Sequence, residues 1–181
     1  RLVQRAVGVR LPLVQHGALG GAGLGLDQQE VRVFEPVGPE HGNPAMRDEA
    51  DAARFAEITA TELAAVGINM NLAPVVDVAP EGFDSIMAGR AFGADPRWVA
   101  RLAGTVIDGL QSRRIMAVAK HFPGIGRTTL DSHRDRPVMD ADLADLEACD
   151  LVPFRAAVDR KVAGIMLSHI LYTCLDRKWP A

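Results

Sequence analysis

Two short and continuous apolar runs constrain the fold of this chain most strongly. Residues 115–119 and 162–167 contain no alternating polar residue, a pattern typical of strands that are buried on both faces. A predicted helical region over residues 141–160, interrupted or kinked at Pro153, lies between them. Because parallel strands need a crossover connection, usually a helix, this order predicts an α/β protein with a parallel sheet.

The preceding part of the chain repeats the same alternation. A first helix is expected over residues 49–66, with Gly67 at its C-terminal cap, and a second helix begins after the N-cap residue Asp95 and fades by Ser112. Residues 68–72 alternate with a period of two, which predicts a strand between the helices. The expected core stripes are Phe55, Ile58, Leu63 and Val66 in the first helix and Trp98, Leu102, Val106 and Leu110 in the second.

Composition excludes several classes of function. The 181 residues are enough for one domain of roughly 150 residues, and 20 Lys and Arg against 23 Asp and Glu argue against a nucleic-acid partner or an anionic membrane surface. No apolar run approaches the roughly 20 residues of a membrane span. The two cysteines, Cys149 and Cys174, make no disulfide framework, which favours a reducing compartment and hence a cytoplasmic location. The five histidines do not have the spacing of a metal site.

Polar residues gather where the predicted strands end. Asp27, Asp77, the pair 120–121 and His169 each lie at or just after such an end. The carboxyl ends of the strands meet at one mouth in a (β/α) barrel, so this placement favours a barrel. A Rossmann fold stays possible from periodicity alone, although no G-x-G-x-x-G follows a strand.

The segment from Lys120 to His133 carries the most chemical information. Lys120 and His121 end a buried strand, where charged groups are costly unless they meet a ligand or a partner. Asp131 and His133 are one residue apart, and a carboxylate bonded to an imidazole makes a usable acid/base. The alternatives are a structural ion pair for Lys120 and His121, a surface hydrogen bond for Asp131 and His133, and a solvated charge for Arg90.

Four motifs occur together and in a fixed order: residues 67–78 (GINMNLAPVVDV), 89–93 (GRAFG), 120–124 (KHFPG) and 131–133 (DSH). In this order they resemble glycoside hydrolase family 3, and most closely its β-N-acetylglucosaminidase branch. The resemblance implies a partial TIM (β/α)8 barrel, since such a barrel normally needs roughly 250 residues. Residues 1–181 are then expected to be the N-terminal portion of one catalytic barrel domain, truncated at both ends.

The same resemblance implies a function and a set of site residues. The expected activity is retaining hydrolysis of terminal β-linked N-acetylglucosamine, on peptidoglycan or chitooligosaccharide fragments, without a metal or cofactor. The general acid/base would be His133, supported by Asp131. The sugar would be held by Asp27, Arg90, Lys120 and His121. The aspartate nucleophile is expected beyond Ala181, so the chain alone is expected to be inactive.

The sequence departs from the family pattern at two places. The loop after Asp27 lacks the usual pair of glycines, and Ile125 stands where the branch commonly has a histidine. Two other functions stay open. One is a non-catalytic remnant or sugar-binding module; the other is an aldolase-type enzyme with Lys120 as a Schiff-base lysine. The sequence makes no prediction of the oligomeric state.

Overall fold

The computed structural model describes residues 7–8, 31–34, 45–129 and 137–180. Within these ranges the main sheet has the strand order β1-β2-β3-β4-β6, and a second, two-stranded sheet pairs β5 with β7. The strands are β1 (Val7–Gly8), β2 (Arg32–Phe34), β3 (Met70–Asn71), β4 (Met116–Phe122), β5 (Val138–Met139), β6 (Gly164–Leu167) and β7 (Leu171–Tyr172). All pairs are parallel except β1 with β2, which is antiparallel.

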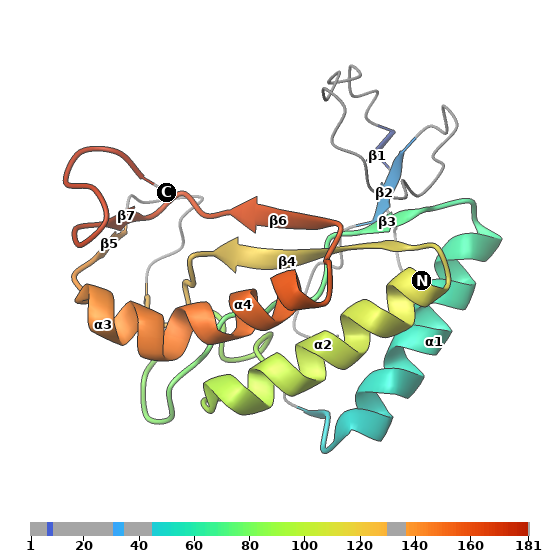
Figure 1. The fold of residues 1–181 in the computed structure, drawn as a ribbon, viewed down its shortest axis with the longest axis horizontal. Helices are drawn as coiled ribbons and strands as arrows, with labels where there is room; N and C mark the ends of the chain where they lie inside the picture. Colours follow the sequence, from blue (N-terminus) through green and yellow to red (C-terminus); the bar gives the residue numbers. More distant parts are fainter. Residues whose placement is uncertain (1–6, 9–30, 35–44, 130–136, 181) are drawn as a thin grey trace.

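The helices cover one side of the main sheet (Figure 1). They are α1 (Glu49–Ala65), α2 (Pro96–Ser112), the short α3 (Leu143–Asp145) and α4 (Leu151–Asp159), with a π-helical turn, η3 (Leu146–Asp150), joining α3 to α4. The α2 helix packs against both α1 and α4. This alternation of parallel strands and helices confirms the predicted α/β class, and the described strands do not close into a barrel. None of the described helices is long and apolar enough to cross a membrane.

The predicted ends of the first two helices are confirmed. Asp95 caps α2 by accepting a hydrogen bond of 2.9 Å from the Arg97 amide, and Pro96 takes the first helical position. The α1 helix ends at Ala65, and Gly67 just beyond it has a φ of 74°. That left-handed conformation is the one that glycine adopts at low cost.

The core stripe predicted for the first helix is confirmed for Leu63 and for Phe55, which packs against the core, but it is wrong for Ile58 and Val66. Ile58 and Val66 are 46% and 60% exposed, whereas the buried positions of α1 are Ala52, Ala56, Ala60 and Leu63. The reason is close packing of α1 on α2, since a Cβ at Gly109 would lie 2.6 Å from the Cβ of Ala56. Larger side chains do not fit between helices at that distance, so they point outward. The stripe predicted for the second helix is confirmed for Leu102, Val106 and Leu110.

The irregularity in the third helical region lies before Pro153 rather than at it. Pro153 is buried within α4, and the five residues that precede α4 form η3. A proline has no amide proton to give to the carbonyl four residues earlier, and the wider π-helical turn replaces the regular helical pattern just upstream. Its last residue is Asp150, which is 1% exposed.

The last strand of the main sheet is less buried than its sequence predicts. On β6, Ile165 and Leu167 are 37% and 60% exposed. Ile165 pairs with Ala119 of β4, so its side chain lies on the face of the sheet that the helices cover. However, β6 is the last strand in the order, and among the described strands it pairs only with β4. The apolar run at residues 162–167, which predicted a buried strand, therefore forms a strand that is half exposed at the edge of the described sheet.

We expect the contact between α1 and α2 to depend on small side chains. Ala56→Leu should lower the free energy of unfolding by about 1–3 kcal/mol, because Ala56 is fully buried against Gly109 and added methyl groups overpack the helix crossing. The matched control is Ala53→Leu at an exposed position of the same helix, which should change stability little. Urea unfolding of both variants measures the difference, and equal stability of the two would contradict the packing argument.

Candidate active site

The site is built where β4 ends. The β4 and β6 strands point in the same direction, toward β5 and β7 (Figure 1). Lys120 and His121 lie inside β4, not after it, because Val75 pairs with Lys120 and the Val76 amide donates a hydrogen bond of 2.8 Å to the Lys120 carbonyl. The Lys120 side chain is fully buried. The neighbouring Lys120–His121 peptide bond is cis.

Asp77 is the buried carboxylate around which these residues are arranged. Its side chain is fully buried and accepts a hydrogen bond of 2.8 Å from the Ile125 amide. It also accepts from the backbone amide of His121, at 3.3 Å to each oxygen. Its Oδ2 atom lies 2.8 Å from Nδ1 of the same histidine. These N–H donors replace the water that a buried carboxylate loses.

The contact with Asp77 fixes the proton of the His121 ring. An ionised carboxylate can only accept, so Nδ1 of His121 must carry a hydrogen. The opposite nitrogen, Nε2, is then the atom that is available to a ligand. The ring is 16% exposed, so it is held near the surface of the site and not within the core.

A tight turn over residues 123–128 follows these residues. Gly126 approaches the neighbouring segment so closely that a Cβ there would lie 1.9 Å from the Val78 carbonyl oxygen. The Ile86 amide donates a hydrogen bond of 3.1 Å to the Thr128 carbonyl, which joins the turn to the loop that carries Arg90. Arg90 is half-buried in that loop, with its Nη1 4.0 Å from the sulfur of Met87. The structure therefore brings two of the predicted sugar-binding segments side by side.

Sequence reasoning missed a second group of residues behind the turn. Arg127 and Asp150 form an ion pair, and the Tyr172 hydroxyl donates a hydrogen bond of 2.6 Å to the Gly124 carbonyl. Burial is the main cause that raises the pKa of Asp150, while the charge of Arg127 opposes it. Burial also raises the pKa of Tyr172. No spacing in the sequence connects these residues, because the η3 turn and β7 are brought to the site only by the fold.

Three predicted site residues, Asp27, Asp131 and His133, lie outside the described residues. Ile125, the position that departs from the family pattern, is 3% exposed and packs in an apolar cluster with Val75, Leu146 and Ile170. Its side chain thus contributes to packing and offers no polar group to the site. His169 at the end of β6 is exposed.

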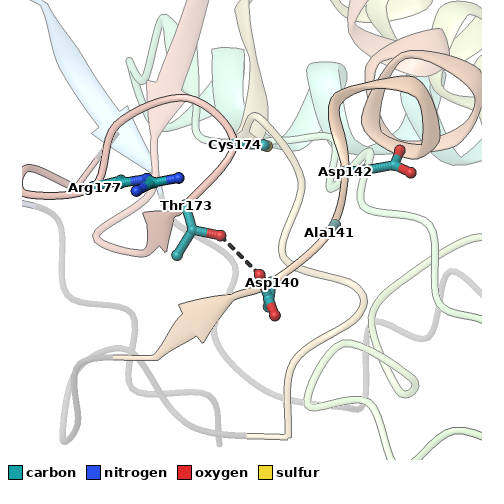
Figure 2. A pocket seen from close by; sticks show the side chains of 6 residues that line it. All are labelled: Asp140, Ala141, Asp142, Thr173, Cys174 and Arg177. Atoms are coloured by element: carbon teal, nitrogen blue, oxygen red, sulfur yellow. Dashed lines mark hydrogen bonds between the residues drawn. The ribbon is translucent and has the colours of Figure 1, made fainter.

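An open pocket of about 580 Å³ lies beside the small sheet (Figure 2). Asp140 and Thr173 follow the paired ends of β5 and β7, and the Thr173 hydroxyl donates a hydrogen bond of 3.0 Å to the Asp140 carboxylate. The lining residues are Asp140, Ala141, Asp142, Thr173, Cys174 and Arg177. None of them was predicted as a site residue.

The described residues include two free thiols. Cys149 and Cys174 are both free and half-buried, and burial raises the pKa of Cys149 above its ordinary value. Among the residues that the structure describes, no three His, Cys, Asp or Glu side chains gather as they would around a metal ion.

Known proteins resemble this chain in both sequence and structure. The chain is 38% identical over 125 residues to a β-hexosaminidase of Nitrosomonas eutropha, covering 69% of this chain and 36% of that protein. It is 40% identical over 116 residues to the β-hexosaminidase LpqI of Mycobacterium tuberculosis, covering 64% and 30%. The chain thus spans about a third of the length of these relatives.

Solved structures of similar enzymes also match this chain. NagZ from Neisseria gonorrhoeae, in complex with N-trifluoroacetyl-D-glucosamine, matches with a TM-score of 0.67 and 37% identity over 72% of this chain and 38% of that one. A family 3 β-N-acetylglucosaminidase from Paenibacillus matches with a TM-score of 0.70 and 36% identity over 74% and 26%. Residues 40–181 match the N-terminal domain of glycosyl hydrolase family 3, a TIM-barrel-like fold. This chain therefore belongs to glycosyl hydrolase family 3, whose β-hexosaminidases are its relatives.

Proposed function

We propose that the protein containing this chain hydrolyses terminal β-linked N-acetylglucosamine with retention of configuration. The observation that carries the proposal is the contact between the buried Asp77 carboxylate and Nδ1 of His121. This contact leaves the other imidazole nitrogen available at the carboxyl end of β4. The relatives named as β-hexosaminidases, and the NagZ structure that holds an N-acylated glucosamine, support the same substrate class.

In this proposal Asp27, Arg90, Lys120 and His121 hold the sugar. The Arg90 guanidinium and the Lys120 ammonium donate hydrogen bonds to hydroxyl oxygens, while Nε2 of His121 accepts or donates according to its protonation. Lys120 and His121 are fixed by β4 and Asp77, so little side-chain freedom is lost when a sugar binds.

The proposed chemistry uses His133 as the general acid/base, with Asp131 bonded to its ring. Protonated His133 gives a proton to the glycosidic oxygen while an aspartate attacks the anomeric carbon and the bond to the aglycone breaks. Neutral His133 then takes a proton from water, which attacks the same carbon and releases the aspartate. The proposal places that aspartate beyond Ala181.

The proposed substrates are peptidoglycan or chitooligosaccharide fragments that end in N-acetylglucosamine. The cytoplasm is the proposed location, because both cysteines are free thiols, as is usual in a reducing compartment.

The activity is tested with an aryl N-acetyl-β-glucosaminide. A form that continues past Ala181 through the following strands, called the extended form below, should release the phenol, and the 181-residue chain should not. Proton NMR of the first product should show the β-anomer, as retention requires. Activity of the 181-residue chain would overturn the placement of the nucleophile. Binding of N-acetylglucosamine without hydrolysis by the extended form would favour a sugar-binding module.

His133→Ala in the extended form should remove the acid/base. We expect kcat/KM for a substrate with a poor leaving group to fall by roughly 100- to 10,000-fold. A 2,4-dinitrophenyl leaving group needs little protonation, so cleavage of its glycosidic bond should be affected much less. The control is Glu62→Ala at an exposed position of α1, which should leave both rates unchanged. A near-normal rate of His133→Ala with the poor leaving group would reject the assignment.

A further inference from the structure

The turn over residues 123–128 is anchored by three segments besides β4. Asp77 accepts from the Ile125 amide, and Tyr172 on β7 donates to the Gly124 carbonyl. Asp150, from the η3 turn, binds Arg127 near the end of the turn. The Asp77 carboxylate also contacts His121, as described above. The contacts of Tyr172 and Asp150 reach the turn from β7 and η3.

Asp150 packs directly on the turn. Gly124 has a φ of 128°, and a Cβ there would lie 2.7 Å from the Cβ of Asp150. No side chain fits between the two segments, so neither can move toward the other without displacing it. The π-helical turn ends at Asp150, and π-helical turns are frequent at functional sites.

The ion pair between Arg127 and Asp150 is largely desolvated. The Asp150 side chain is 1% exposed and that of Arg127 is 23% exposed. Asp145, which is 65% exposed, lies 3.9 Å from Nη1 of Arg127 and is a second, weaker partner. A buried carboxylate that loses its cation is costly, so the pair holds the two segments together more firmly than an exposed ion pair would.

The turn is connected to His121 through the two oxygens of one carboxylate. Oδ1 of Asp77 accepts from the Ile125 amide at 2.8 Å, and Oδ2 lies 2.8 Å from Nδ1 of His121. If the turn shifts, the Asp77 carboxylate must either rotate with Ile125 or lose that bond. Rotation of the carboxylate would move the oxygen that contacts the His121 ring, and loss of the Ile125 bond would leave the carboxylate freer to rotate.

We propose that Arg127, Asp150 and Tyr172 are positioning residues for His121, because they fix the turn that orients the Asp77 carboxylate. None of the three needs to touch the sugar. This inference rests on the proposed function, since it assigns sugar binding to His121. It predicts that weakening the anchors raises KM while the chemical step is largely preserved.

The test uses Asp150→Asn and, from another segment, Tyr172→Phe in the extended form. We expect KM for the aryl N-acetyl-β-glucosaminide to rise about tenfold for Asp150→Asn and about threefold for Tyr172→Phe, as for partial loss of a hydrogen bond to the sugar, with kcat changed less than about threefold. Arg127→Met should match Asp150→Asn, and Arg127→Lys should restore part of the effect. The double variant at 127 and 150 should be no worse than either single variant.

The matched control is the exposed ion pair on the same helical segment. Glu147 and Arg155 lie 3.7 Å apart, with side chains 54% and 60% exposed. Glu147→Gln and Arg155→Met should leave KM and kcat unchanged. A fall in kcat at constant KM for Asp150→Asn would indicate only a loss of folded protein, and it would overturn the inference. Unchanged values of kcat and KM would overturn it as well. If Asp150→Asn fails to fold, Arg127→Lys and Tyr172→Phe provide the same comparison.

A second measurement does not depend on activity. Long-range proton–nitrogen NMR reports the protonated nitrogen of each imidazole, and the His121 signals are identified by their loss in His121→Gln. We expect the parent to show hydrogen on Nδ1, and Asp150→Asn to shift those signals or mix the tautomers. If the parent hydrolyses no substrate, the proposed function fails and this comparison still decides the inference. Unchanged ring signals in Asp150→Asn would overturn it.

Discussion

The buried carboxylate of Asp77 is the interaction on which the site depends. It stands outside any regular strand, yet it joins the segment after β3 to the end of β4 and to the turn that follows. A fully buried carboxylate is costly unless hydrogen bonds replace its water, and here amide and ring donors do so. The same bonds that stabilise the charge therefore also fix the geometry of His121.

Several charged side chains in this part of the structure are buried. Asp77 and Asp150 are buried, and so is Lys120, while Arg127 is mostly shielded from solvent. Burial is the main cause that raises the pKa of Asp150, Asp77 lies close enough for its charge to raise that pKa further, and the charge of Arg127 opposes both effects. Removing Arg127 would therefore leave the Asp150 carboxylate buried without its cation, which is costly.

The sequence was sufficient to predict the class of fold. Apolar runs predicted the parallel strands, since this feature depends on local pattern. The structure places Lys120 and His121 inside β4, with His121 in contact with Asp77, and their role in sugar binding stays a prediction. The core stripe of α1 was predicted wrongly at Ile58 because hydrophobicity favours it over Ala56, whereas the close approach to Gly109 accepts only a small side chain. The roles of Asp150 and Tyr172 depend on tertiary contacts with Gly124, which no spacing along the chain reveals.

The thiol of Cys149 can be used to follow the packing of η3 behind the turn. It precedes Asp150 in the η3 turn, it is half-buried, and its raised pKa leaves little thiolate at neutral pH. Because the thiolate is the reactive form, alkylation of Cys149 should be slow while η3 stays packed. The rate at which a thiol reagent modifies this cysteine therefore measures how often the segment behind the turn opens in the native protein.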